Sequence, residues 1–161
     1  MNPDSNLTAL ARNNRTCMIA HTATAGVMLL LLFLQAATRG INPAVLTISC
    51  ILGIAPVAAE LLYWKKNHET TAIRHLVGNG FAVFFTFYIY TSTTFMASVF
   101  VIPMIVVISL YNNKKFSLLV NTGVVIETII LAVIGIQSGK YAYPDSDTAI
   151  IHVIFVILVA V

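Results

Sequence analysis

The sequence predicts an all-α integral membrane protein, and two observations support this prediction. First, the chain of 161 residues contains six apolar runs separated by short polar loops. Second, only 9% of its residues are charged, whereas soluble domains carry about 25% charged residues. So few charges cannot cover the surface of a water-soluble domain. We therefore expect one transmembrane domain of six helices over residues 18–161, preceded by a short cytoplasmic lead at 1–17.

The lead is polar and shows no apolar periodicity. Asn6 is a candidate helix cap within it, which predicts a helix that begins near Leu7. The first apolar run, Met18–Thr38, is longer than the core of about 7–15 residues found in a signal peptide. We therefore expect this run to remain in the mature protein as the first span.

The second, third and fourth runs are Val45–Trp64, Leu76–Tyr90 and Phe95–Tyr111. Gly40 is expected to end the first helix in a turn before the second run. The third and fourth runs are short for a helix that crosses a bilayer, which needs about 20 apolar residues. Only residues 91–94 separate them, so we expect these two helices to be antiparallel neighbours.

The fifth run is Phe116–Gly135, and the sixth begins at Ile150. The sixth run reaches Val161 before it is long enough to span. We therefore expect the sequence to be a fragment of a longer chain, with a truncated sixth helix.

The distribution of basic residues predicts that both termini are cytoplasmic, because Lys and Arg collect in the inner loops of membrane proteins. With the N-terminus inside, the inner segments hold Arg12, Arg15, Lys65, Lys66, Arg74, Lys114 and Lys115, and the outer loops hold Arg39 and Lys140. The positive net charge thus follows from membrane orientation, and we expect no nucleic-acid partner. The predicted location is the inner (plasma) membrane, with the lipid bilayer as the first partner.

Glu127 is the clearest candidate functional residue, since it lies about 16 Å along the helix from Phe116, near the bilayer midplane. Inserting an ionisable group at that depth costs roughly 2.5 kcal/mol or more. The side chains one helical turn away are apolar or glycine. Glu127 must therefore be protonated, pair with another helix or face a wet cavity. A ligand- or proton-sensing role and a neutral glutamic acid that joins helices are both open.

Glu60 and His21 form a second candidate site for ligand or proton sensing. Each lies within about one turn of the predicted cytoplasmic end of its span, so the two side chains share a depth. They are placed to form a hydrogen bond between the first two helices. The alternative is that both side chains extend to water at the interface. His152 is a further group able to titrate near neutral pH, or a solvated histidine at a helix end.

Pro56 and Pro103 lie near the middle of the second and fourth spans, where each removes a helix hydrogen bond. We expect two helix kinks, although paired central prolines also occur at transporter sites between repeats. Small residues four apart let helices approach closely in lipid. The sequence offers three such pairs: Thr22 with Gly26, Ser49 with Gly53, and Ala55 with Ala59.

The sequence shows no convergent set of nucleophile, base and metal ligands, so we expect no enzymatic activity, no metal site and no cofactor. Its two cysteines, Cys17 and Cys50, are predicted at different depths in the bilayer. Because disulfide partners need Cα atoms within about 7 Å, we expect both thiols to be free.

Short motifs between Arg12 and Tyr111 carry one family resemblance. They are Asn14-Arg15-Thr16, Ala20-His21, Phe87-Tyr88, Pro103-Met104 and Leu110-Tyr111. Together they resemble the N-terminal membrane module of multi-span bacterial methyl-accepting chemotaxis receptors. The resemblance implies a homodimer, joined by a cytoplasmic coiled coil that engages a histidine kinase through a coupling adaptor. The outer loops of this chain are too short to form the extracellular ligand domain of a typical two-helix receptor.

Three functional hypotheses follow. The first is a sensory module that passes a stimulus through the sixth helix to a cytoplasmic output domain. The second is a small transporter or channel-like protein that uses Glu127. The third keeps the sensory module but places it before a sensor kinase or a cyclic-dinucleotide enzyme.

Overall fold

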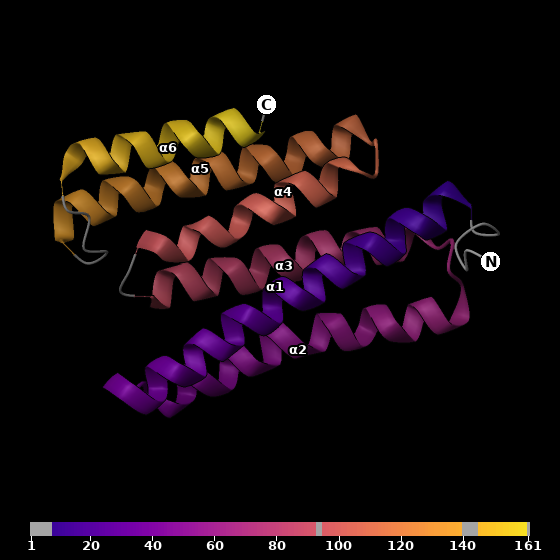
Figure 1. Cartoon of the computed structure of the whole chain (residues 1–161), viewed down its shortest axis with the longest axis horizontal. Helices are drawn as coiled ribbons and strands as arrows, with labels where there is room; N and C mark the ends of the chain where they lie inside the picture. Colours follow the sequence, from indigo (N-terminus) through magenta and orange to yellow (C-terminus); the bar gives the residue numbers. More distant parts are fainter. Residues whose placement is uncertain (1–7, 93–94, 140–144, 161) are drawn as a thin grey trace. The chain divides into compact units, whose positions relative to one another are not determined.

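The computed structural model describes residues 8–92, 95–139 and 145–160 (Figure 1). These ranges are helical apart from their turns and contain no strand, which confirms the predicted all-α class. The elements are α1 (Ala9–Arg39), α2 (Pro43–Lys66), α3 (Thr71–Thr91), the 3-10 helix η1 (Phe95–Phe100), α4 (Val101–Ser109), α5 (Lys114–Ser138) and α6 (Ser146–Ala160). The chain divides into two compact units, Met1–Phe84 and Phe85–Val161.

Four of these helices, α1, α2, α3 and α5, are long and apolar enough to cross a membrane. Their outward faces are covered by large apolar side chains, among them Leu30 at 58% exposure and Leu119 at 73% exposure. Such a surface suits hydrocarbon rather than water. The remaining two helices are shorter, with 9 residues in α4 and 15 in α6.

Helix α1 begins within the polar lead, nine residues before the first apolar run at Met18. It starts at Ala9, and the side chain of Thr8 caps it by accepting a hydrogen bond from the backbone N–H of Ala11 at 3.3 Å. The polar lead is thus helical from Ala9 onward. Ala11 and Asn14 in this segment are buried, and this packing stabilises the helix. The candidate cap Asn6 and the predicted start Leu7 lie outside the described residues.

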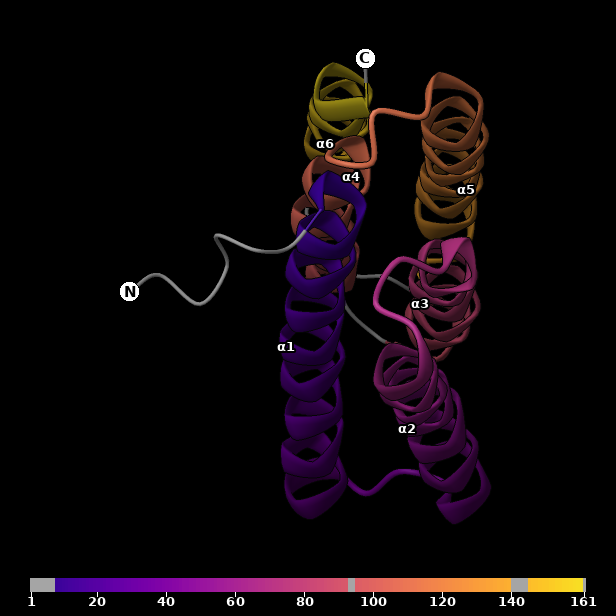
Figure 2. The same cartoon turned by 90° about the vertical axis from the view of Figure 1, so that its right-hand side faces the viewer.

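The first unit begins with an antiparallel hairpin of α1 and α2. Helix α3 follows and runs antiparallel to α2 (Figures 1 and 2). From His21 to Leu29 on α1, the contact on α2 moves back from Glu60 to Gly53. A Cβ atom at Gly53 would lie 3.1 Å from Leu29 and 3.2 Å from Phe84 of α3. This small residue therefore lets three helices meet closely.

The second unit contains the end of α3, η1, α4, α5 and α6, with α6 beside α5 (Figure 1). The side chain of Asn121 on α5 donates a hydrogen bond to the backbone oxygen of Ala160 on α6 at 2.7 Å. The fourth predicted span is divided, since its first part is 3-10 helix. Pro103 is the third residue of α4 and cannot donate a hydrogen bond to the carbonyl of Val99, so the α-helical ladder does not extend back into η1.

Three features of the predicted topology lie outside the described residues. They are the tip of the turn between the third and fourth runs, at residues 93–94, the centre of the loop before the sixth run, at residues 140–144, and the outer basic residue Lys140.

Candidate functional site

The candidate site of the first unit is a fully buried pair formed by His21 of α1 and Glu60 of α2. The Nδ1 atom of His21 lies 2.6 Å from Oε1 of Glu60, and both side chains are 0% exposed. The predicted hydrogen bond between the first two helices is thus present. The alternative in which both side chains extend to water is wrong.

Both members lie within their helices rather than at the ends. His21 is about 18 Å along α1 from its first residue, and Glu60 is about 9 Å before the end of α2. The register of the hairpin sets them opposite one another. Since α1 extends well before Met18, His21 is further from the start of its helix than from the start of the predicted span.

The third wall of this site comes from α3. The ring of His21 meets the ring of Phe81 edge-to-face, with centroids 6.0 Å apart. A Cβ atom at Gly80 would lie 3.6 Å from Cε1 of His21 and only 2.5 Å from Cβ of Pro56. The glycine therefore allows the ring of Pro56 to lie directly against α3, which closes the site from that side.

Pro56 lies inside α2, as the sequence indicates. The structure adds a packing role for this residue, namely the contact with Gly80 of α3. The predicted kink at this position remains a prediction.

Asn14 is a buried polar residue that the sequence analysis missed. Its side chain is 0% exposed, and its Nδ2 atom donates to the backbone oxygens of His68 and Thr70 at 2.9 and 3.1 Å. These bonds tie α1 to the turn between α2 and α3. The available signal was spacing, because Asn14 lies seven residues before His21 and so on the same helix face.

Three buried polar atoms of these residues have no hydrogen-bond partner in the described part of the chain. They are Oδ1 of Asn14, Nε2 of His21 and Oε2 of Glu60. Orphan polar atoms are rare in buried positions and cost free energy. The site therefore holds hydrogen-bonding capacity that the described residues leave unused.

The chemistry available to the pair is acid–base chemistry. An imidazole and a carboxyl group within hydrogen-bond distance share one proton, which is carried either by Nδ1 of His21 or by Oε1 of Glu60. Adding a second proton leaves a cation between the helices, and removing the shared proton leaves an anion. Either change alters the charge in a site closed from water.

Glu127 lies in the second unit and has a different environment. Its side chain is half-buried, and it forms a hydrogen bond with the side chain of Thr86 on α3. Its Oε1 atom has no partner among the described residues. Thr86 is thus a polar neighbour of Glu127 on another helix, and the three possibilities that the sequence leaves open for Glu127 stay predictions.

Other sequence-based expectations have mixed outcomes. Neither Cys17 nor Cys50 forms a disulfide bond, as predicted. His152 is 9% exposed, so the interpretation of a solvated histidine at a helix end is wrong. The described residues contain no group of three or more His, Cys, Asp or Glu placed to hold a metal ion.

The three small-residue pairs also differ from one another. Ser49 is buried and Gly53 packs against two helices, so this pair lies at a close contact. A Cβ atom at Gly26 would meet nothing within 4 Å, so this glycine makes no close contact in the described structure. The third pair, Ala55 with Ala59, lines a groove between α2 and α3.

Comparisons with known proteins give no further assignment. No protein-family model, no curated protein and no solved structure has significant similarity to this chain.

Proposed function

We propose that this chain is the membrane-embedded sensory module of a signalling protein, and that the His21–Glu60 pair is its stimulus-responsive element. The observation that carries the proposal is the complete burial of an ionisable pair between two helices long enough to span a membrane. Ionisable groups inside membrane segments are expensive to insert and are generally functional. A gain or loss of one proton at this pair changes the energy of the contact between α1 and α2.

The pair acts within a defined neighbourhood. Glu60 on α2 is the titratable group in contact with His21, whereas α3 faces the imidazole with Phe81 and Gly80. When both groups hold a proton, the carboxyl group still accepts through its carbonyl oxygen, but it is neutral, so the buried imidazolium has lost the negative charge beside it. The hairpin of α1 and α2 then relaxes, and this change in helix packing is the proposed signal.

We further propose that the module has six spans with both termini in the cytoplasm, in the inner (plasma) membrane. The seven basic residues on one side and two on the other support this orientation. Membrane-impermeant maleimide labelling of single cysteines in intact cells tests it, after both native cysteines are replaced by serine. Asn67→Cys is expected to stay unlabelled and Gly139→Cys to be labelled, and the reverse pattern would contradict the orientation.

The proposed output follows from the resemblance to chemotaxis receptors. In that interpretation the signal leaves through α6 to a cytoplasmic coiled coil, the protein is a homodimer, and a histidine kinase is engaged through a coupling adaptor. A sensor kinase or a cyclic-dinucleotide enzyme is the alternative output for the same module. A monomeric mass of the full-length protein in native mass spectrometry would contradict the dimer.

Pulsed electron–electron double resonance tests the sensory proposal directly. Spin labels at Leu10 on α1 and Lys66 on α2 report the separation of the two helices in nanodiscs. We expect the distance distributions recorded at about pH 8 and about pH 5 to differ. The double variant His21→Leu with Glu60→Leu should lose this change. A wild-type distribution that is independent of pH would refute the proposal.

A second candidate function is a small proton- or cation-conducting transporter that uses Glu127. The specific observation in its favour is the buried Oε1 atom of the half-buried residue Glu127, which has no partner in the described ranges. Proton and cation uptake into liposomes that contain the purified chain tests this function. Uptake by wild type that is lost in Glu127→Gln supports it, and absence of uptake by wild type excludes it.

A further inference from the structure

We propose that the groove between α2 and α3 binds one acyl chain of an anionic phospholipid, with the lipid headgroup at the basic end of α2. The inference goes beyond the sensory proposal and uses the proposed orientation only to choose the cytoplasmic leaflet. It rests on three observations: the shape of the groove, its polarity from end to end and its depth.

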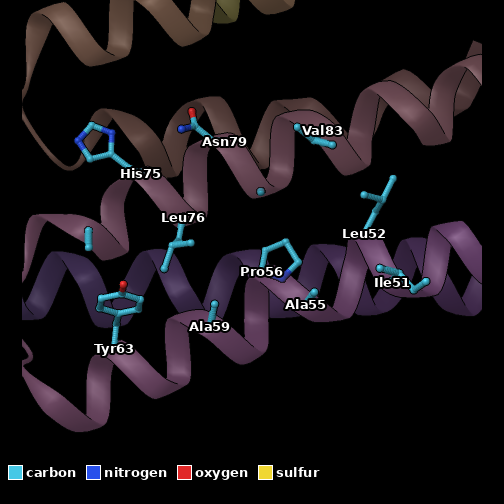
Figure 3. Close-up of a pocket in the computed structure, with 12 residues that line it drawn as sticks. Ile51, Leu52, Ala55, Pro56, Ala59, Tyr63, His75, Leu76, Asn79 and Val83 are labelled. Carbon is cyan, nitrogen blue, oxygen red and sulfur yellow. The ribbon is translucent and has the colours of Figure 1, made fainter.

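The groove is open on one side and has a volume of about 740 Å³, which is within the usual range of about 300–1,000 Å³ for small-molecule sites. Helix α2 lines it with Leu52, Ala55 and Ala59, and α3 lines it with Leu76 and Val83 (Figure 3). The two alanines leave the space that larger side chains would fill. In a bilayer, hydrocarbon chains are the molecules that reach such an opening.

The groove is polar at one end and apolar at the other. Tyr63 and His75 lie at one end, and Leu52 and Val83 lie at the opposite end (Figure 3). Three basic residues flank the polar end in sequence: Lys65 and Lys66 follow Tyr63, and Arg74 precedes His75. This polarity matches an amphiphile with an anionic head, since basic residues next to the inner leaflet attract anionic lipids.

The length of the groove corresponds to one leaflet. Leu52 and Tyr63 are about 16 Å apart along α2, whereas half of the hydrocarbon core measures about 15 Å. A single acyl chain therefore fits the groove from its basic end to the bilayer midplane. A small soluble ligand would use only part of this length.

The floor of the groove is the contact between Pro56 and Gly80, and Gly80 also adjoins the ring of His21. A chain in the groove therefore packs on the residues that close the His21–Glu60 site. The groove and the His21–Glu60 site therefore share this contact.

Native mass spectrometry of the full-length chain tests the proposal, with added phosphatidylglycerol or phosphatidylcholine as the probe. We expect one phosphatidylglycerol to survive detergent removal where phosphatidylcholine is lost. Ala59→Leu fills the groove and should abolish this retention. Ala58→Leu is the matched control, because Ala58 is exposed on the same helix and does not line the groove.

A second variant tests the contribution of the basic residues to binding of the headgroup. Arg74→Gln should weaken retention of phosphatidylglycerol by about fivefold, the factor expected for loss of one basic residue near an anionic headgroup. Equal retention of the two lipids, or equal loss in Ala58→Leu and Ala59→Leu, would overturn the proposal. Retention of an uncharged molecule that Ala59→Leu abolishes and Ala58→Leu does not would also overturn it.

A second measurement does not depend on the folding of any variant. Phosphatidylglycerol with a photoreactive acyl chain is crosslinked to the wild-type chain in nanodiscs, and the modified residues are mapped. Crosslinks concentrated on the residues that line the groove support the proposal. Crosslinks spread evenly over the exposed faces of α1, α2, α3 and α5 contradict it.

Discussion

Glu60 in the first unit and Glu127 in the second are both carboxyl groups on helices long enough to span a membrane, but their surroundings differ. Glu60 is fully buried and lies 2.6 Å from an imidazole nitrogen. Glu127 is half-buried and hydrogen-bonds the hydroxyl of Thr86. The first carboxyl group has a partner that can take its proton, and the second has a partner that cannot.

This difference in proton-accepting partners is the basis on which we propose different roles for the two carboxyl groups. A carboxyl group paired with histidine has two arrangements that differ in where the shared proton lies, on the imidazole nitrogen or on the carboxyl oxygen. A carboxyl group paired with a hydroxyl group has one favoured arrangement. For this reason we place the sensory role at Glu60 and the alternative transport role at Glu127.

The largest effect is expected from Glu60→Leu. It removes the partner of Nδ1 of His21, and the fully buried imidazole then loses its hydrogen bond. Leaving a buried polar group unsatisfied costs roughly 1–3 kcal/mol. Reversible unfolding of the purified protein in mixed micelles measures this loss in the free energy of unfolding.

The double variant His21→Leu with Glu60→Leu is the control for this experiment. Replacing both members of a buried polar pair by apolar residues is often neutral or stabilising. We therefore expect the double variant to regain most of the stability that the single variant loses. Additive losses would contradict a direct pair.

The next effect concerns the glycine that closes the first site. Gly80→Ala places a Cβ atom 2.5 Å from Cβ of Pro56, so α2 and α3 must separate. Overpacking of this kind costs about 1–3 kcal/mol, part of which is offset by the higher helix propensity of alanine. Thermal unfolding should show a lower midpoint for Gly80→Ala.

Gly26→Ala serves as the matched control for that substitution. A Cβ atom at Gly26 meets nothing within 4 Å, so only the gain in helix propensity remains. We expect an unchanged or higher midpoint. A lower midpoint in Gly26→Ala would show that the effect at Gly80 is not specific to the contact with Pro56.

The contrast between these two glycines also shows how far the sequence predicts the structure. Helix positions follow from hydropathy, because a long apolar run in lipid must satisfy its own backbone hydrogen bonds. The His21–Glu60 pair was predictable since both residues were placed at one depth of adjacent, antiparallel helices. Which glycine is packed depends on helix rotation, and the sequence does not specify that rotation.

Other parts of the site depend on contacts that are distant in sequence. The local sequence places Asn14 in a polar lead. Its hydrogen bonds reach backbone oxygens more than 50 residues away, and such partners cannot be identified from the residues around Asn14. Thr86 was not identified as the partner of Glu127, since threonine on an apolar helix gives no signal of its own. The change from η1 to α4 follows from the missing N–H of Pro103, but its location was not predicted.

A smaller effect is expected at the second carboxyl group. Thr86→Val removes the hydroxyl partner of Glu127 with little change in volume, and hydrogen bonds between membrane helices contribute about 0.6 kcal/mol on average. Because Glu127 is half-buried, its carboxyl group can find other partners. Unfolding of Thr86→Val under the conditions used for Glu60→Leu measures the difference. A loss as large as that of Glu60→Leu would remove the contrast between the two sites.

The smallest effect is expected at Asp145. Its carboxyl group is fully exposed, whereas Glu60 is buried and Glu127 is half-buried. Asp145 precedes α6, and its Oδ1 atom accepts a hydrogen bond from the backbone N–H of Thr148 at 2.6 Å. Hydrogen bonds from the backbone and side chain of Thr148 hold the pKa of Asp145 below its ordinary value of 3.8. These bonds favour the charged carboxylate, which also suits the positive end of the helix dipole.

The lowered pKa fixes the sign of the pH dependence at this cap. Because the pKa is lower in the folded state, Asp145 stabilises the start of α6 fully at pH values above 3.8 and loses this contribution as the pH falls through the lower folded value. An NMR titration of the carboxyl carbon measures this pKa, and amide exchange at Thr148 measures the cap. Asp145→Asn should retain a cap that no longer responds to acid, whereas Asp145→Ala should lose it at every pH. A measured pKa at or above 3.8 would contradict the assignment of Asp145 as a charged cap.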